Sequence, residues 1–238
     1  MSRPIQLYYW PTPNGFKITI MLEELEAPYE IKLVNILKGD QFKEDFLKIS
    51  PNNRMPAIID PDGPGGRPIS VFESGAILQY LGRKYGKFYP ADERARVAVE
   101  EWLFWQIGGL GPMAGQAHHF IRYAPEKIPY AMDRYRNESK RLYGVIERQL
   151  KATGADYLAG DYSIADMAAI GWAVAHDWHE VSFDDLPLVK GWYDRVLARP
   201  AVQRGLAIGA EERAKAKPLA EDEEAKKILF GQGGAAKP

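Results

Sequence analysis

The sequence predicts an α/β fold followed by an all-α fold within one chain of 238 residues. Between residues 5 and 85, short apolar segments of strand length alternate with helical patterns, whereas from Asp92 to about Gly209 only helical patterns occur. A chain of this length can form one large domain or two small ones. The break near residues 86–90 therefore predicts two domains, 1–86 and 91–209, with a C-terminal tail at 210–238.

The first part predicts the element order βαβαββα, which is typical of a small α/β domain with a mixed sheet. Ile18, Leu22 and Leu25 recur at helical spacing, and Ser50-Pro51 ends the second helix. A turn rich in Pro, Asp and Gly joins the last two strands. The predicted strands are 5–10, 29–36, 57–60 and 69–72, and the predicted helices are 14–25, 41–49 and 73–85.

The second part predicts helices throughout. An amphipathic helix is expected over 92–106, and the glycine-rich segment 108–112 should kink or break it. Another long helix is expected over 129–150. Ser163-Ile164-Ala165-Asp166 has the pattern of a capping box at a helix start, and such a cap contributes about 1 kcal/mol to stability.

Composition excludes several classes of function. The net charge of −1 gives no electrostatic basis for binding nucleic acid or an anionic membrane surface. The chain contains no cysteine, which excludes disulfides, thiolate metal sites and a protein thiol nucleophile. Met1-Ser2-Arg3-Pro4 lacks the long apolar region of a signal peptide, and no run reaches transmembrane length. We therefore expect a cytoplasmic protein whose sulfur chemistry, if any, uses sulfur brought by a ligand.

Two segments predict a small polar pocket. In residues 52–60 a proline stands at the head of a short apolar strand, where its missing N–H places it at an edge or in a special turn. In residues 72–77 a Glu-Ser pair opens an apolar helix, so a carboxylate and a hydroxyl lie beside free backbone N–H groups. Such a pocket suits a zwitterionic peptide backbone.

These segments resemble the glutathione-binding core of glutathione transferases. The segment 9–19, Tyr-Trp-Pro-Thr-Pro-Asn-Gly-Phe-Lys-Ile-Thr, is similar to the nu class, which includes bacterial disulfide-bond oxidoreductases. The resemblance covers roughly residues 5–208. It implies a thioredoxin-like N-terminal domain, a helical C-terminal domain, a homodimer, and one or two glutathione molecules per subunit as cosubstrate, with no metal.

The resemblance implies that Thr12 and Asn14 stabilise the glutathione sulfur as a thiolate. They stand between the first strand and the first helix, and a helix N-terminus lowers the pKa of a thiol. The alternative is that both residues only form a turn and a helix cap. Tyr8 and Tyr9 compete for the sulfur, as tyrosine does in other transferase classes, but the match to Thr-Pro-Asn-Gly is longer. We therefore expect both tyrosines to be core or wall residues.

The resemblance also implies the contacts of the peptide part of glutathione. Met55 would pair its backbone with the cysteinyl unit, with Pro56 in the cis form. Glu73 and Ser74 would hold the ammonium and carboxylate of the γ-glutamyl unit, since the N–H of Ser74 opens a helix and suits an anion.

Three further residues are implied as ligands, each with a plainer alternative. Gln41 and Arg54 would meet the glycyl end of glutathione, or they are ordinary polar surface residues. The family often has lysine in the place of Arg54, which keeps the charge but not the geometry. Arg134 would reach the glutathione of the neighbouring subunit, or it forms a surface ion pair.

Aromatic and histidine residues of the helical part carry weaker signals. Trp102–Gln106 and Gly108–Met113 resemble a nu-class stretch at the dimer interface and cleft wall, although aromatic residues at helical spacing are also typical of a core. His118 and His119 follow, but adjacent helical side chains point about 100° apart, so they are a poor metal site. The tail is expected to be partly ordered, or to cover the active-site cleft.

We therefore predict a glutathione-dependent thiol–disulfide oxidoreductase that acts on small disulfides. Weak conjugation of electrophiles and peroxide reduction are neighbouring activities, since they use the same activated sulfur. A non-catalytic binding or regulatory module with this fold is the alternative. A dedicated enzyme of ether cleavage or dehalogenation would depend on side chains of the cleft.

Overall fold

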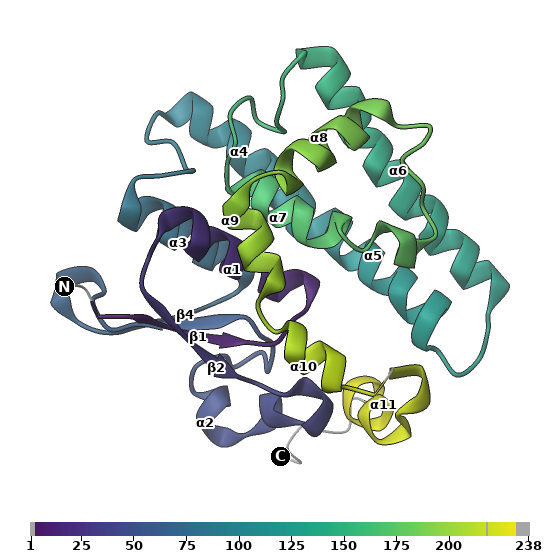
Figure 1. The fold of residues 1–238 in the computed structure, drawn as a ribbon, viewed down its shortest axis with the longest axis horizontal. Helices are drawn as coiled ribbons and strands as arrows, with labels where there is room; N and C mark the ends of the chain where they lie inside the picture. Colours follow the sequence, from purple (N-terminus) through teal and green to yellow (C-terminus); the bar gives the residue numbers. More distant parts are fainter. Residues whose placement is uncertain (1–2, 218, 232–238) are drawn as a thin grey trace.

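The computed structural model describes residues 3–217 and 219–231, which form an α/β unit followed by a helical unit (Figure 1). The α/β unit has the predicted strands and helices, with three short 3-10 turns in its loops. Its elements are β1 (Ile5–Tyr9), α1 (Pro13–Leu25), β2 (Tyr29–Leu33), η1 (Ile36–Lys38), η2 (Asp40–Phe42), α2 (Glu44–Leu47), β3 (Ala57–Asp60), η3 (Pro64–Gly66), β4 (Ile69–Phe72) and α3 (Ser74–Tyr85).

The four strands form one mixed sheet in the order β2-β1-β3-β4, which is the thioredoxin-like arrangement. β1 is parallel to β2 and antiparallel to β3, and β3 is antiparallel to β4. The buried residues Ile5, Leu7 and Tyr9 alternate along β1 and join the main core. Tyr8 points to the opposite face, where it packs with Phe46 of α2. The sheet is thus covered on both faces.

The first strand ends at Tyr9 and the first helix begins at Pro13, each one residue from its predicted boundary, and three further elements of the α/β unit differ from the prediction. The predicted strand 29–36 ends at Leu33, because the side chain of Asn35 accepts a hydrogen bond from Leu37 N and begins η1. The predicted helix 41–49 is split into η2 and the short α2. Helix α3 starts at Ser74, because Glu73 has a positive φ of 70° and lies outside the helix.

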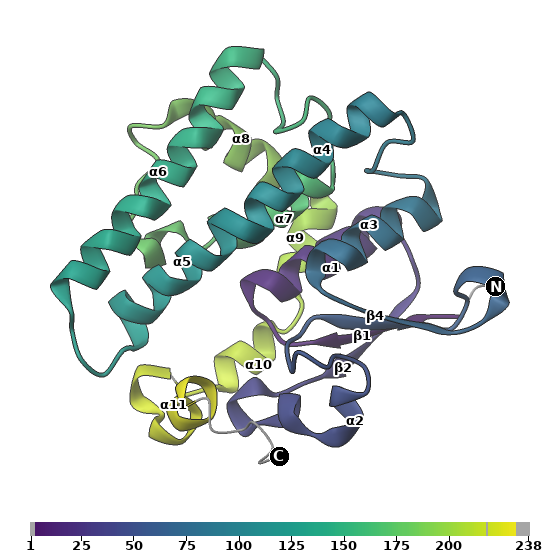
Figure 2. The ribbon, with the colours of Figure 1, turned by 180° about the vertical axis from the view of Figure 1, so that it is seen from behind.

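The helical unit accounts for the rest of the described chain (Figure 2). Its first helices run on through two π-helical turns, η4 and η5, and its last two helices belong to the predicted tail. Its elements are α4 (Glu93–Trp105), η4 (Gln106–Leu110), α5 (Gly111–His118), η5 (His119–Tyr123), α6 (Pro129–Thr153), α7 (Ile164–Ala173), η6 (His176–His179), α8 (Pro187–Leu197), α9 (Pro200–Ala207), α10 (Ala210–Lys215), η7 (Leu219–Glu221) and α11 (Glu223–Phe230).

The glycine-rich segment was predicted to kink or break the helix, and the structure shows an interruption of the α-helix without a break. The backbone stays helical from α4 into α5 and widens into the π-helical turn η4 over Gln106–Leu110. Pro112 lies in the first turn of α5, directly after the π-helical turn, where its missing N–H removes one hydrogen bond from the continuous helix. The predicted tail contains α10 and α11, and its residues 232–238 lie outside the described part of the chain.

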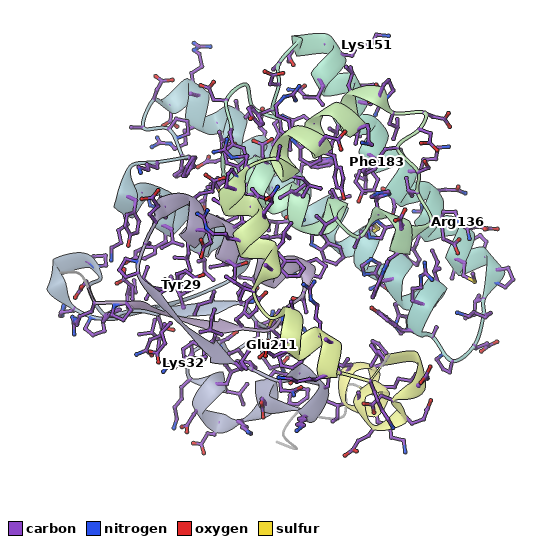
Figure 3. All side chains as sticks on the ribbon, viewed as in Figure 1. Tyr29, Lys32, Arg136, Lys151, Phe183 and Glu211 are labelled. Atoms are coloured by element: carbon purple, nitrogen blue, oxygen red, sulfur yellow. The ribbon has the colours of Figure 1, made fainter. Side chains whose placement is uncertain are left out.

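Side chains fill the space between the helices (Figure 3). Phe183 lies with its ring 5.0 Å from that of Tyr143 on α6 and 5.5 Å from that of Tyr193 on α8. Aromatic pairs at such distances contribute about 0.5–1.5 kcal/mol to stability beyond the contribution of their buried area.

Among the described residues, no helix is both long and apolar enough to cross a membrane.

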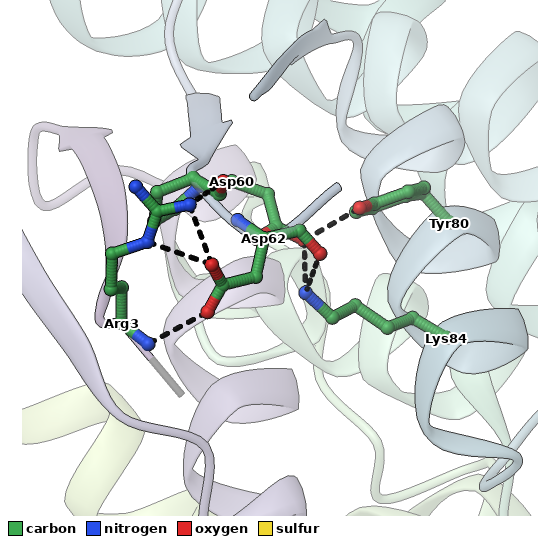
Figure 4. Close-up of polar contacts among 6 residues, drawn as sticks. Arg3, Asp60, Asp62, Tyr80 and Lys84 are labelled. Atoms are coloured by element: carbon green, nitrogen blue, oxygen red, sulfur yellow. Dashed lines mark hydrogen bonds and ion pairs between the residues drawn. The ribbon is translucent and has the colours of Figure 1, made fainter. Parts of the chain in front are cut away.

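A network of charged residues lies at the end of the sheet where β1 begins and β3 ends (Figure 4). Asp60, at the end of β3, is buried and accepts hydrogen bonds from Tyr80 Oη and Lys84 Nζ of α3. Arg3 binds Asp62 through its backbone N–H and its guanidinium. The hydrogen bonds hold the pKa of Asp60 below its usual range although burial raises it. The network ties α3 to the sheet.

Helix α1 is enclosed by both units, because α3, α7 and α9 all pack against it. Two glycines allow its neighbours to approach closely. A Cβ at Gly171 of α7 would lie 2.5 Å from Pro13 O, and one at Gly205 of α9 would lie 2.7 Å from Ile20 N. Any side chain at either position would push the helices apart.

The predicted capping box is present at the start of α7. Its aspartate, Asp166, is buried and does more than cap the helix. The carboxylate accepts hydrogen bonds from the N–H groups of Leu158 and Ser163 at 3.0 Å each and from Trp192 Nε1 at 2.9 Å. It therefore joins α7, the loop before it and α8.

We expect Asp166→Ala to lower the free energy of unfolding by about 3 kcal/mol, because a buried donor left without a partner costs about 1–3 kcal/mol. The measurement is urea unfolding followed by circular dichroism. Asp92→Ala is the matched control, since Asp92 caps α4 at an exposed site with one hydrogen bond, to Ala95 N, and should cost about 1 kcal/mol. Equal losses in the two variants would contradict the wider role of Asp166.

Candidate active site

A cleft with two adjoining lobes lies where the α/β and helical units meet. The smaller lobe has a volume of about 600 Å³ and the larger one about 980 Å³. Lys17, Gln106, Ile107 and Gln116 line the smaller lobe, whereas Trp10, Gln41, Met55, Tyr123 and Trp178 line the larger one. Asn14, Arg54, Glu73, Ser74, His119, Trp172 and Phe230 line both.

Thr12 is the N-cap of α1. Its Oγ1 accepts a hydrogen bond from Gly15 N at 3.3 Å and lies 3.4 Å from Trp10 O and 3.7 Å from Met55 Sδ. Thr12 therefore forms the helix cap that was predicted as the alternative to a role in binding sulfur. Its hydroxyl also borders the larger lobe.

Asn14 is held by a tryptophan that sequence reasoning missed. Trp172 Nε1 of α7 donates a hydrogen bond to Asn14 Oδ1 at 3.1 Å. An indole nitrogen can only donate, so the atom facing it must be the amide oxygen. The amide Nδ2 of Asn14 then keeps its two hydrogens for a ligand at the N-terminus of α1. No local pattern pairs residues 158 positions apart, so the sequence alone gave no signal for this contact.

Tyr9 and Tyr8 are wall and core residues, as predicted. Tyr9 is fully buried, and its hydroxyl donates to Ile208 O at 3.0 Å. Burial also raises the pKa of the Tyr9 phenol. The hydroxyl is thus engaged away from the cleft.

The loop before β3 presents free backbone groups. The Met55–Pro56 peptide bond is cis, as predicted. Neither the N–H nor the C=O of Met55 forms a hydrogen bond with another described residue. Ser50 Oγ donates to Arg54 O at 2.7 Å and fixes the preceding residue. The Arg54 side chain is exposed at the rim of both lobes.

Glu73 and Ser74 lie side by side where β4 passes into α3. Glu73 has φ 70° and ψ 118°, a conformation that is costly for a residue with a side chain and is concentrated at functional sites. Its carboxylate lies 3.5 Å from Asn52 Nδ2. Ser74 is buried at the first turn of α3, with its Oγ 3.3 Å from Lys17 Nζ.

Gln41 is not a surface residue. It is 2 % exposed, its Nε2 donates to Ile36 O at 3.2 Å, and its Oε1 is buried without a partner among the described residues. The alternative of ordinary surface polarity is therefore excluded for Gln41, which lines the larger lobe with a free acceptor.

Arg134 lies outside the cleft of its own chain. It is exposed on α6, and its guanidinium is 4.0 Å from Glu138 of the same helix. Within one chain the structure does not bring it to the other predicted site residues.

The two adjacent histidines have different surroundings. His118 is buried and stacks on His179 with ring centroids 4.5 Å apart, and burial lowers the pKa of His118 to about 4 and that of His179 to about 3. Both rings are thus neutral at pH 7. His119 points into the cleft and contacts Phe230. Among residues 3–217 and 219–231, no group of three potential ligands could hold a metal ion.

The predicted tail lies over the cleft. Helix α11 packs against η1 and lies beside the α/β unit (Figure 1). The ring of its Phe230 is 4.8 Å from that of His119 and 5.9 Å from that of Tyr123. Leu229 and Phe230 line both lobes. The segment therefore connects the two units across the opening and gives it an apolar wall.

Family models match both units of the chain. The glutathione S-transferase N-terminal domain matches residues 3–83, and the glutathione S-transferase C-terminal domain matches residues 112–200.

Individual proteins match nearly the whole chain. The disulfide-bond oxidoreductase YfcG of Escherichia coli is 49 % identical over 204 residues, which cover 85 % of this chain and 94 % of that protein. A glutathione transferase of Burkholderia graminis, solved with two glutathione molecules per subunit, has a TM-score of 0.83 and 45 % identity and covers 86 % of this chain and 88 % of its own. One of Pseudomonas putida, solved with one glutathione disulfide per subunit, has a TM-score of 0.82 and 45 % identity, with 86 % and 91 % covered.

Proposed function

The chain belongs to the glutathione transferase family, and from this premise we propose that it is a nu-class, glutathione-dependent thiol–disulfide oxidoreductase. The observation that carries the proposal is the orientation of Asn14, whose amide N–H groups are free at the start of α1. The chain has no cysteine, so the reactive sulfur must come from glutathione. The relatives solved with two glutathiones or with glutathione disulfide support a cleft that takes both reaction partners.

Several of the predicted contacts would use groups that line the cleft. The backbone of Met55 would pair with the cysteinyl unit, Ser74 would hold the γ-glutamyl carboxylate and Glu73 its ammonium. Gln41 and Arg54 would meet the glycyl end. The sulfur would then lie near Asn14 Nδ2 and the N-terminus of α1, where hydrogen bonds and the helix dipole favour a thiolate.

The reaction needs two glutathione molecules and no protein thiol. The first thiolate attacks one sulfur of the substrate disulfide, forms a mixed disulfide, and releases the other half, which takes up a proton to become a thiol. The second thiolate attacks the glutathione sulfur of the mixed disulfide and releases the second thiol. The two glutathiones lose two electrons as they become glutathione disulfide, and the substrate gains them.

Turnover separates this proposal from a non-catalytic module. Purified protein with glutathione and 2-hydroxyethyl disulfide should reduce the disulfide, followed through glutathione reductase and NADPH. Tight binding of glutathione without turnover would instead favour the binding or regulatory alternative. Conjugation and peroxide reduction, measured on the same preparation, show which use of the activated sulfur is fastest.

We also propose a homodimer in which Arg134 serves the neighbouring site, and a cytoplasmic location. Large apolar side chains are exposed on α4 and at the start of α6, among them Phe104 at 60 % and Tyr130 at 80 %. These helices run along one face of the helical unit (Figure 2). A second copy that covers this face would bury these side chains and bring Arg134 beside its partner.

Asn14→Ala should lower disulfide reduction at least about tenfold, because the thiolate loses a donor fixed beside the helix terminus. Trp172→Phe should lower it about threefold to tenfold, because the amide is then free to turn its oxygen to the sulfur. The bound thiol, followed by thiolate absorbance near 240 nm, should titrate at a higher pH in both variants. In the double variant, Trp172→Phe should cause no further loss. Full additivity would show that Trp172 acts only through packing.

Glu73→Ala should raise the KM for glutathione about tenfold and leave the fold intact, because a charged hydrogen bond to the ammonium is lost at an exposed position. Steady-state kinetics with varied glutathione give the KM, and a thermal melt checks the fold. A normal KM would show that the ammonium is held elsewhere.

Mixed dimers test Arg134. If it serves the neighbouring site, a dimer of one Glu73→Ala and one Arg134→Ala subunit contains one intact site, because the intact Glu73 and the intact Arg134 then meet at the same cleft. Such heterodimers, purified with two affinity tags, should recover about half of the wild-type activity at low glutathione. If Arg134 acts within its own subunit, the heterodimer shows only the mean of two impaired parent variants. If it acts at no site, the Arg134→Ala homodimer keeps the wild-type activity.

A further inference from the structure

Lys17 is a buried cation at the junction of the two units. It is 1 % exposed, and most of the buried residues of its helix α1 are apolar. Its Nζ donates to Ser74 Oγ at 3.3 Å and to Gln106 Oε1 at 2.6 Å. A lysine ammonium has three N–H donors, so one remains for another acceptor on the side of the smaller lobe, which Lys17 lines.

The positive charge of Lys17 has no direct partner. Both of its acceptors are neutral, and no carboxylate of the described residues forms an ion pair with it. Lysine is almost never fully buried unless it is paired, because removing a charge from water is costly. The burial lowers the pKa of Lys17 to about 7, and the more distant Glu73 acts in the opposite direction. The ammonium is therefore poised to gain from an arriving anion.

None of the neighbouring side chains named below provides a negative charge in contact with Lys17. Arg54 and His119 line the same lobe but carry no negative charge, and Glu73 is exposed at its rim. From α7, Gly171 packs against the lysine stem, where a Cβ would lie 3.3 Å from Lys17 Cγ. Trp172 of the same helix is bound to Asn14.

Gln106 provides an independent sign of a missing acceptor. It is fully buried, and its Nε2 has no hydrogen-bond partner among the described residues. Lys17 fixes the amide, because the ammonium can bind only the oxygen and leaves the NH₂ group as a donor. A buried donor without a partner costs about 1–3 kcal/mol, so a ligand acceptor there would be stabilising.

We propose that Lys17, supported by Gln106, is the counter-charge for the α-carboxylate of the γ-glutamyl unit held at Ser74. This inference rests on the proposed binding of glutathione in the cleft. Ser74 Oγ lies directly against Lys17 Nζ, so a carboxylate bound to the hydroxyl comes within reach of the charge. Its arrival raises the pKa of Lys17 and draws a proton from solution when binding occurs above pH 7.

The test uses S-methylglutathione, which has no ionisable thiol, so that protons from the sulfur do not enter the measurement. Calorimetry at about pH 8 in buffers of different ionisation enthalpy gives the number of protons taken up on binding. The wild-type protein should take up a large fraction of one proton per site. The matched ligand is the analogue with 4-aminobutyrate in place of the γ-glutamyl unit, which keeps the ammonium but lacks the α-carboxylate. It should bind at least about tenfold more weakly, without that proton uptake.

Lys17→Met is the matched variant, since it keeps the length of the side chain and removes the charge. It should bind S-methylglutathione at least about tenfold more weakly, lose the proton uptake, and bind the two ligands with similar affinity. The Lys17→Met variant keeps His119, so comparing it with the wild-type protein separates proton uptake by Lys17 from proton uptake by His119. The variant should raise the KM for glutathione much more than it lowers kcat.

Two results would overturn the assignment. One is wild-type proton uptake that is equal for the two ligands, a result that requires no variant. The other is an equal penalty for the missing carboxylate in wild type and Lys17→Met. Failure of the wild-type protein to bind S-methylglutathione at all would instead contradict the proposed function itself.

Discussion

The site depends on the close packing of α1 between the two units. Two neighbouring helices meet α1 at Gly171 and Gly205, where their backbones leave no room for a side chain. This fixes the helix terminus that faces the cleft. The same contact brings Trp172 to Asn14 and seats Lys17 between the units, beside Ser74 and Gln106. A shift of α1 by about 1 Å would break these hydrogen bonds together, because their geometry tolerates little lengthening.

Local patterns predicted most of the fold because they act over a few residues. The strands, the long helices and the capping box at Ser163 were all visible in periodicity and cap residues. The errors arose where two local preferences compete or where tertiary packing decides. Asn35 ended a strand by a side-chain cap, and the glycine-rich segment stayed helical as a π-turn although glycine and proline favour a break. Propensity is a weak guide where packing holds the backbone.

The predictable part of the site consists of short contiguous segments. Thr12, Asn14, Met55 and Ser74 lie in such segments, and the structure places all four at one cleft. Trp172 was missed because it enters the cleft from a distant helix, and no spacing in a sequence encodes such a meeting. Gln106 lies in a segment that was predicted as cleft wall, and Phe230 lies in the tail, for which covering the cleft was one alternative. Lys17 gave one signal, a single lysine inside an apolar helix. Arg134 stays a prediction, since one chain cannot contain a contact with its neighbour.

The enclosure of α1 has a consequence for how the protein is made. Residues 13–25 emerge early from the ribosome, yet the helices that cover them end at Ala207. Within the first domain α3 already packs against α1, but the face of α1 that meets α7 and α9 stays uncovered until nearly the whole chain has been translated. Contacts between residues so far apart in sequence slow folding and prolong the exposure of apolar surface, which favours aggregation.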